Sequence, residues 1–314
     1  MLNLCTTPKP GSPRTFQERR TLRFVSSLLS LLWMAQSALA AHVLHTEKLL
    51  YRHILVYEDG GERCMAFSQR DHGTRQTCRS LTDPNVLVFP YTRLLMGALY
   101  LNPQPQRILI IGLGGGVLPM ALASLYPAAD MDLVEIDPAI TRVAQHFFGF
   151  KPSSSRRVTE EDGRVFAKRA IKAQQHYDLI LLDAFDHHYI PEHLLTQEFL
   201  TEIKSLLTPQ GVLAANTFST SQLYDHESAT YEAVFGTFYN LRLENKNRII
   251  LLQRDGVPSA EVVARNAAAL EAKLKPLGVG QAELLPLFSS ARDWNPNARL
   301  LTDQYAPSNV LNTP

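Results

Sequence analysis

The stretch that decides the fold is Arg107–Pro138, RILIIGLGGGVLPMALASLYPAADMDLVEIDP. It opens with the apolar run Ile108–Ile111, which predicts a buried parallel strand, because strands covered on both faces have unbroken hydrophobic sequences. Four glycines follow: Gly112, Gly114, Gly115 and Gly116. Glycine permits a tight turn and lets a ligand come close to the backbone. Val117–Leu125 has helical spacing, so the glycines lead into the N-terminus of a helix.

A second apolar run, Met131–Ile136, carries Glu135 and is followed by Asp137. An acidic residue about twenty positions after a glycine turn suits the ribose diol in a βαβ nucleotide site. A glycine turn can also serve only close packing. The order of strand, glycines, helix, strand and acid favours the nucleotide site over that alternative.

The composition describes an ordinary globular protein with a sizeable core. The chain has 314 residues, of which 45% are hydrophobic and 19% charged, with a formal net charge of +1. This length suits one large domain, or one domain with a small appendage. Nothing in the charge balance indicates a nucleic-acid partner.

The first forty residues have the build of a secretory signal peptide. Five basic residues and only one acidic residue, Glu18, precede the largely apolar stretch Phe24–Ala35, and Ala38-Leu39-Ala40 matches a small-residue cleavage site. We therefore expect residues 1–40 to be a leader and the protein to be periplasmic or secreted. An uncleaved N-terminal membrane anchor, or a cytoplasmic protein with a wrongly assigned start, is the alternative.

Residues 41–86 are expected to form a small β domain. Short alternating segments between Lys48 and Arg79 predict an antiparallel sheet. Cys64 and Cys78 flank the turn-rich segment 69–75, which would close a hairpin. In an exported protein they could form a disulfide; two ordinary half-buried thiols are the alternative.

Residues 87–314 are expected to form an α/β domain around the opening βαβ unit. Further strands are predicted at 157–159, 177–182 and 212–215, and helices at 88–100, 139–148, 164–173, 196–207 and 224–236. The segments 238–243 and 248–253 read as an antiparallel pair. The alternation predicts a mostly parallel sheet with helices on both faces and one antiparallel closing strand.

Three acidic residues fall where strands of this sheet end: Glu135, Asp162 and Asp183. Ligands of open α/β sheets bind at the carboxyl ends of the strands. Each residue alone would be an unremarkable surface acid, but three together after glycine turns indicate a site. His187, His188 and His193 follow in the same region with loose spacing, and we expect no metal there.

These motifs resemble the spermidine synthases, or polyamine aminopropyltransferases, which have a methyltransferase-like Rossmann fold. The closer similarity is to bacterial spermidine-synthase-like proteins, over roughly residues 48–310. The motifs that carry it are GLGGG at 112–116, VEIDP at 134–138, Asp162-Gly163, LDAFD at 182–186, Ile190-Pro191 and LTDQYAP at 301–307.

The resemblance implies a role for each matching residue. Decarboxylated S-adenosylmethionine would bind through the glycines Gly112, Gly114 and Gly116, with Glu135 on the ribose and Asp162-Gly163 at the adenine. Asp183 would be the base that deprotonates the attacking polyamine amine. Asp186 and Tyr91 would bind that amine. The oligomeric state stays open, with a homodimer as one option.

The glycine loop departs from the family pattern at one position. Gly115 stands where the synthases have an aspartate that contacts the aminopropyl ammonium, and Phe185, His187 and His188 replace the usual residues around Asp186. A methyltransferase that uses S-adenosylmethionine is therefore an alternative, since Gly115 removes a charge that would repel the carboxylate of that cofactor. An exported, non-catalytic nucleoside or polyamine binder is a second alternative.

Overall fold

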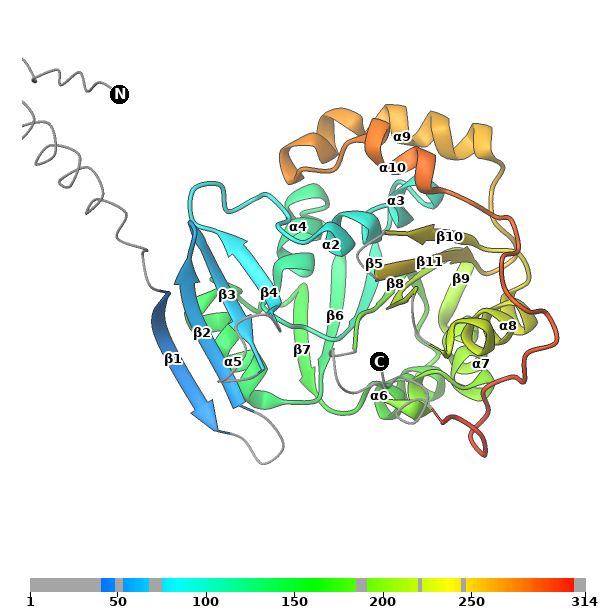
Figure 1. Cartoon of the computed structure of the whole chain (residues 1–314), viewed down its shortest axis with the longest axis horizontal. Coiled ribbons are helices and arrows are strands. Elements are labelled where there is room, and N and C mark those ends of the chain that lie inside the picture. The colour runs from blue at the N-terminus through cyan, green and yellow to red at the C-terminus, as the bar shows by residue number, and fades with distance from the viewer. Residues whose placement is uncertain are drawn as a thin grey trace, which may run out of the picture. The chain divides into compact units, whose positions relative to one another are not determined.

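The apolar run that opens the deciding stretch is an inner strand of a seven-stranded sheet (Figure 1). The strand order is β10 (Tyr239–Arg242), β11 (Asn247–Gln253), β9 (Leu207–Phe218), β8 (Tyr177–Leu182), β5 (Arg107–Ile111), β6 (Asp130–Glu135) and β7 (Arg156–Glu160). The computed structural model describes residues 41–48, 53–67, 75–184, 191–219, 222–243 and 247–307.

The register of this sheet brings the ends of β5, β6 and β8 to one edge. β5 runs parallel to both neighbours, with Ile111 opposite Val134 and Leu182. Among the seven strands, β11 alone runs against the others. The predicted mostly parallel sheet with one reversed strand is therefore confirmed.

Helices cover both faces of the sheet, because each presents an apolar stripe to it. One core cluster packs α2 (Pro90–Leu95), α3 (Ala98–Leu101), α4 (Val117–Leu125) and α9 (Ala260–Leu274) on the first face. The other packs α6 (Gly163–Lys172), α7 (Gln197–Leu206) and α8 (Tyr224–Phe235) on the second. Figure 1 shows α9 above the sheet and α6 to α8 below it. Short helical turns complete the chain at η1 (Glu192–Leu194), η2 (Lys275–Leu277), α10 (Gln281–Leu284) and η3 (Leu285–Leu287).

In the seven-stranded sheet and the helices that cover it, three elements differ from the sequence prediction. The helix expected over 88–100 is divided at Gly97, where a β-carbon would lie 2.9 Å from the Leu94 carbonyl oxygen and 3.2 Å from Leu251. β9 begins at Leu207 rather than at residue 212, because Leu207 already pairs with Tyr177 before an irregularity in the register. α9 was not predicted at all.

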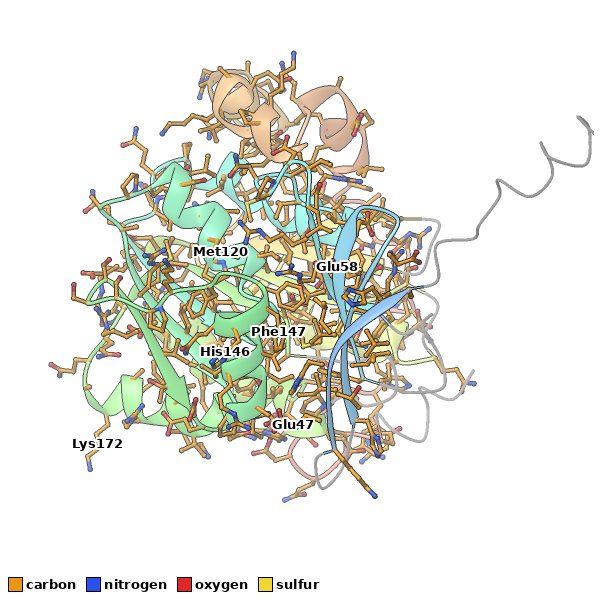
Figure 2. All side chains as sticks on the ribbon, turned by 90° about the vertical axis from the view of Figure 1, so that its left-hand side faces the viewer. Glu47, Glu58, Met120, His146, Phe147 and Lys172 are labelled. Carbon is orange, nitrogen blue, oxygen red and sulfur yellow. A yellow bond between two sulfur atoms is a disulfide. The ribbon has the colours of Figure 1, made fainter. Side chains whose placement is uncertain are left out.

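A four-stranded antiparallel sheet precedes the seven-stranded sheet in the chain. Its strands, in order, are β1 (His42–Lys48), β2 (His53–Asp59), β3 (Glu62–Ala66) and β4 (Arg75–Ser80). Ile54, Val56 and Met65 pack against α5 (Pro138–Phe147), the helix that follows β6. Figure 2 shows this arrangement, with Phe147 on the helix facing the strands.

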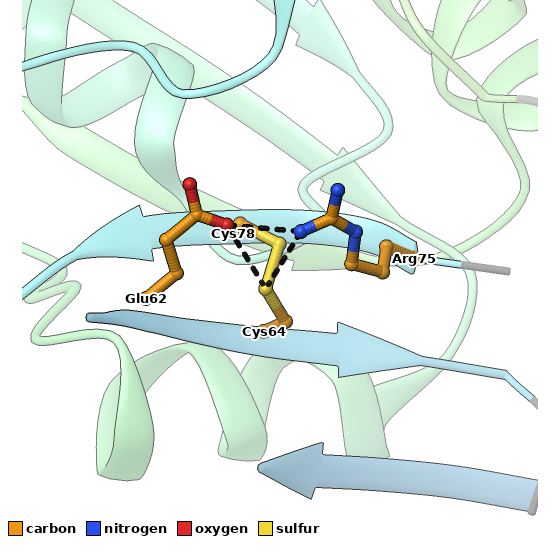
Figure 3. Close-up of a disulfide and its surroundings, with 4 residues drawn as sticks. All are labelled: Glu62, Cys64, Arg75 and Cys78. Carbon is orange, nitrogen blue, oxygen red and sulfur yellow. Dashed lines mark hydrogen bonds and ion pairs between the residues drawn. A yellow bond between two sulfur atoms is a disulfide. The ribbon is translucent and has the colours of Figure 1, made fainter. Parts of the chain in front are cut away.

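A disulfide joins the third and fourth strands of this small sheet. Cys64 and Cys78 lie directly opposite each other in the β3–β4 register and are covalently linked. Arg75 and Glu62 form an ion pair of 2.9 Å (Nη1 to Oε2) beside the sulfur atoms (Figure 3). The two cysteines are therefore a cross-link of the hairpin rather than two separate thiols.

No helix in the described ranges is long and apolar enough to cross a membrane. The expected leader, residues 1–40, lies outside those ranges.

A buried arginine on β11 contacts the edge strand β10 and the helix α8. Arg248 on β11 is 0% exposed, and its Nε and Nη2 donate to Asn240 Oδ1 (2.9 Å) and Ser228 Oγ (2.7 Å). Its Nη1 lies 3.8 Å from Glu227 Oε2, and its guanidinium stacks 4.1 Å from the Tyr224 ring centroid. Burial raises the pKa of Glu227 to about 7, and the charge of Arg248 opposes that rise.

Replacing Arg248 with methionine should therefore destabilise the fold strongly. Removing one partner of a buried ion pair leaves an uncompensated charge and typically costs about 3–5 kcal/mol. Urea denaturation at pH 8 should show this loss for R248M. The double variant R248M/E227Q should recover part of it, because no buried charge then remains. R242M, which removes the partly exposed pair with Asp293, should cost no more than about 1 kcal/mol. Equal losses for R248M and R242M would contradict this assignment.

Candidate functional site

The glycine loop and the end of β8 are in direct contact. The amide of Asp183 donates to the Ile111 carbonyl (2.9 Å), which continues the β5–β8 pairing by one residue. A β-carbon on Gly112 would lie 2.2 Å from the Asp183 carbonyl oxygen, and Gly112 has φ +98°. Only glycine satisfies both conditions. The loop can therefore reach the Asp183 backbone without a side chain between them.

Two further glycines of the loop, Gly114 and Gly116, differ in how closely they are packed. A β-carbon on Gly114 would meet nothing within 4 Å, so this side of the loop has room for a ligand. Gly116 is the N-cap residue of α4 and packs on Phe150. The predicted cofactor glycines thus lie together at the carboxyl edge of the sheet.

The position where the family pattern has an aspartate is filled by neighbouring side chains. A β-carbon on Gly115 would lie 2.6 Å from Thr77 Cγ2 and 3.1 Å from Phe148 Cδ1. Thr77 is buried on β4, next to the disulfide residue Cys78. The small N-terminal sheet therefore closes over the space that a longer residue at 115 would need.

Glu135 lies at the end of β6 and is held by the backbone on both sides. Its Oε2 accepts from the Leu113 amide (3.1 Å) and its Oε1 from the Asp137 amide (3.0 Å). A carboxylate oxygen can accept more than one hydrogen bond, so these contacts fix the group and remain compatible with hydroxyl donors. Asp137 itself caps α5 by accepting from the Ala139 amide.

Asp162 lies at the end of the short segment that links β7 to α6, and it is the N-cap residue of α6. Its Oδ1 accepts from the amides of Arg164 (2.9 Å) and Val165 (3.0 Å), and its Oδ2 lies 2.7 Å from His193 Nε2. Burial raises the pKa of Asp162, but the hydrogen bonds from His193 and the backbone outweigh it and lower the pKa below its ordinary value. Gly163 follows where a β-carbon would lie 2.6 Å from Ile111 Cγ2.

Arg164, near the start of α6, forms an ion pair with the C-terminal segment of the chain. It pairs with Asp303 (Nη1 to Oδ1, 2.6 Å) and Glu202 (Nε to Oε2, 2.9 Å), and Thr196 Oγ1 donates to Asp303 Oδ1 (2.7 Å). Leu301, two residues before Asp303, is fully buried. These contacts give the LTDQYAP motif a structural role that its sequence did not reveal.

The Asp183 carboxyl group is held by two polar neighbours. Asn216 Nδ2 donates to Asp183 Oδ1 (2.9 Å), and the Tyr91 hydroxyl forms a hydrogen bond with the same carboxyl group. Burial raises the pKa of Asp183 to about 7, while these two hydrogen bonds lower it. Burial and the Asp183 charge raise the pKa of Tyr91 well above its ordinary value, so the phenol stays protonated and donates. Sequence reasoning missed Asn216, since nothing in the β9 sequence marks which face it takes.

Two exposed apolar side chains flank the predicted nucleoside residues. Ile136 follows Glu135 and is 65% exposed, and Val165 is 55% exposed in the first turn of α6. They come after neighbouring parallel strands, β6 and β7. Neither residue could be predicted as part of a site, because an apolar side chain at the end of a strand looks the same in sequence whether it packs in the core or faces a ligand.

Asp186, predicted to bind the amine, lies outside the described residues, as do Phe185, His187 and His188. Its role stays a prediction.

Comparisons with known proteins agree with this geometry. A family model for the spermine/spermidine synthase domain matches residues 88–239. The chain is 48% identical over 273 residues to a polyamine aminopropyltransferase of Vibrio vulnificus, and the match covers 86% of this chain and 91% of that protein. The chain belongs to the spermine/spermidine synthase family. The resemblance inferred from the motifs is therefore confirmed.

Two further similarities concern a different reaction class and the fold. The chain is 33% identical over 202 residues to the human eEF1A lysine and N-terminal methyltransferase. This match covers 58% of this chain and 29% of that protein. A probable spermidine synthase from Corynebacterium glutamicum superposes with a TM-score of 0.62 at 20% identity, over 84% of this chain and 96% of that one. This structural similarity confirms the synthase-type fold of this family member.

The raised pKa of Asp183 predicts a specific pH dependence of stability. An unfolded aspartate ionises near pH 3.9, whereas the folded group ionises near pH 7. The unfolded state therefore loses this proton first, and the contribution of Asp183 to stability falls as pH rises from about 4 to about 7. D183N lacks this penalty. Urea denaturation should find D183N more stable than wild type at pH 8, with the gap narrowing toward pH 5. D255N, at an exposed aspartate, is the matched control. A gap that stays constant with pH would contradict a raised pKa.

Proposed function

We propose that this family member is an aminopropyltransferase that moves the aminopropyl group of decarboxylated S-adenosylmethionine to a polyamine such as putrescine. The observation that carries the proposal is the Asp183 carboxyl group, which has a pKa of about 7 and adjoins the glycine loop. A base works best when its pKa lies near the operating pH. The family relationship supplies the reaction class, and the geometry supports the residue roles.

The nucleoside half of the donor would lie along the ends of β5, β6 and β7. Glu135 would accept hydrogen bonds from the two ribose hydroxyls, since its carboxylate is fixed by two backbone amides. Asp162 would accept from the adenine amino group. Ile136 and Val165, both exposed, would cover the faces of the adenine ring with apolar surface. The open side of Gly114 supports the same placement.

The amine half of the reaction would take place at Asp183. Free polyamine nitrogens are protonated near neutral pH, so the Asp183 carboxylate would first accept a proton from the attacking ammonium group. The neutral amine would then attack the methylene carbon next to the sulfonium. As the new carbon–nitrogen bond forms, the carbon–sulfur bond breaks and its electron pair stays on sulfur, which yields methylthioadenosine. Tyr91 and Asn216 would keep the carboxyl group oriented, and Asp186 would anchor the amine.

Gly115 favours one alternative donor. The space beside it is occupied by Thr77 and Phe148, so this loop presents no acidic side chain to the donor. S-adenosylmethionine carries a carboxylate that such a side chain would repel. Methyl transfer from S-adenosylmethionine is therefore the second candidate, and the methyltransferase relative supports it.

The choice between donors is made by a direct assay of the protein. With decarboxylated S-adenosylmethionine and putrescine, cadaverine or spermidine, the wild type should release methylthioadenosine and an extended polyamine, detected by mass spectrometry. D183N should lower kcat by ~10²–10⁴-fold, because it removes a general base. Its affinity for methylthioadenosine should stay nearly unchanged.

D178N provides the matched control, because Asp178 also lies on β8 but accepts hydrogen bonds at the opposite end of that strand. Turnover of S-adenosylmethionine alone would favour the methyltransferase. Binding of methylthioadenosine without turnover of any donor would favour a non-catalytic binder. Full activity of D183N would exclude Asp183 as the base.

A further inference from the structure

One oxygen of the predicted adenine-binding carboxylate already has a side-chain partner. His193 lies in the short turn η1, and its Nε2 is 2.7 Å from Asp162 Oδ2. The other oxygen, Oδ1, accepts the amides of Arg164 and Val165 as the N-cap of α6. A further donor from a nucleobase would therefore be directed to Oδ2, the oxygen that His193 contacts.

We propose that His193 sets the affinity of the site for adenine nucleosides by competing with the adenine amino group for Asp162 Oδ2. This inference rests on the proposed function, which directs that amino group to Asp162. Nothing in the general chemistry of aminopropyl transfer requires a histidine at this position. His193 is thus a specificity-determining residue of this chain.

The backbone around His193 is held by buried neighbours, whereas its imidazole ring is partly exposed to solvent. Arg164 Nη1 contacts the His193 carbonyl at 3.5 Å, and the neighbouring Leu194 and Leu195 are buried. The imidazole side chain, by contrast, is 43% exposed. A nucleobase can therefore displace the ring by side-chain rotation toward solvent, without unfolding the turn.

Asp162 is a charged group in direct contact with the His193 ring. Burial raises the pKa of Asp162, but the hydrogen bonds from His193 and the backbone outweigh it and lower the pKa below its ordinary value. Arg164 contacts the His193 carbonyl and is itself paired with Glu202 and Asp303. The His193 ring therefore meets an ionised carboxylate near neutral pH.

The contact between His193 and Asp162 is a charge-assisted hydrogen bond, because one partner is an ionised carboxylate. Such hydrogen bonds are roughly twice as strong as neutral ones. Removing the imidazole should therefore raise the affinity of the site for an adenine nucleoside.

The test is calorimetric titration of the full chain with 5′-methylthioadenosine at pH 7.5. H193A should bind about tenfold more tightly than wild type, because it removes a hydrogen bond to a charged group. H193Q keeps a side-chain donor, so its affinity should lie between those of wild type and H193A. H146Q is the control, since His146 is an exposed α5 histidine bonded to the Arg142 carbonyl, and it should follow wild type.

A second probe separates competition from a merely structural effect. 5′-Methylthioinosine has a carbonyl in place of the amino group, so H193A should not improve its binding. Unchanged or weaker binding of methylthioadenosine to H193A would overturn the role of His193 alone. Failure of wild-type protein to bind methylthioadenosine would overturn the proposed function, and the inference with it.

Discussion

The structure depends on the close approach of Gly112 to the backbone of Asp183. The parallel register of β5 with β8 brings these residues together, and a β-carbon on Gly112 would stand 2.2 Å from the Asp183 carbonyl oxygen. Because the contact is backbone to backbone, it admits no adjustment by side-chain rotation. It joins a loop suited to a nucleoside with a carboxyl group suited to proton transfer, and places both at the edge where ligands of such sheets bind.

The small N-terminal sheet contributes to the same site from the outside. Its fourth strand carries Thr77, which fills the space next to Gly115, and the disulfide of Cys78 ties that strand to β3. Phe148 fills the same space from the end of α5. An acidic side chain at 115 would require Thr77 or Phe148 to move.

Much of the fold was predictable because its signals are local. The strand at Ile108–Ile111 and the glycines after it specify a βαβ unit through burial and turn geometry alone. The partners of Asp183 could not be predicted, because Asn216 reaches it from β9 across the sheet and only the register decides which face a strand residue takes. The contact of His193 with Asp162 could not be predicted either, since it spans 31 residues and depends on how η1 meets α6.

In the proposed function, the acids at the ends of β6, β7 and β8 form one nucleoside and amine site. A crystal structure of the protein with methylthioadenosine and putrescine is the decisive measurement. We expect the ribose hydroxyls on Glu135, the adenine amino group on Asp162 and the amine beside Asp183, with the sulfur facing that amine. A nucleoside bound with its ribose away from Glu135, or an amine bound away from Asp183, would contradict it.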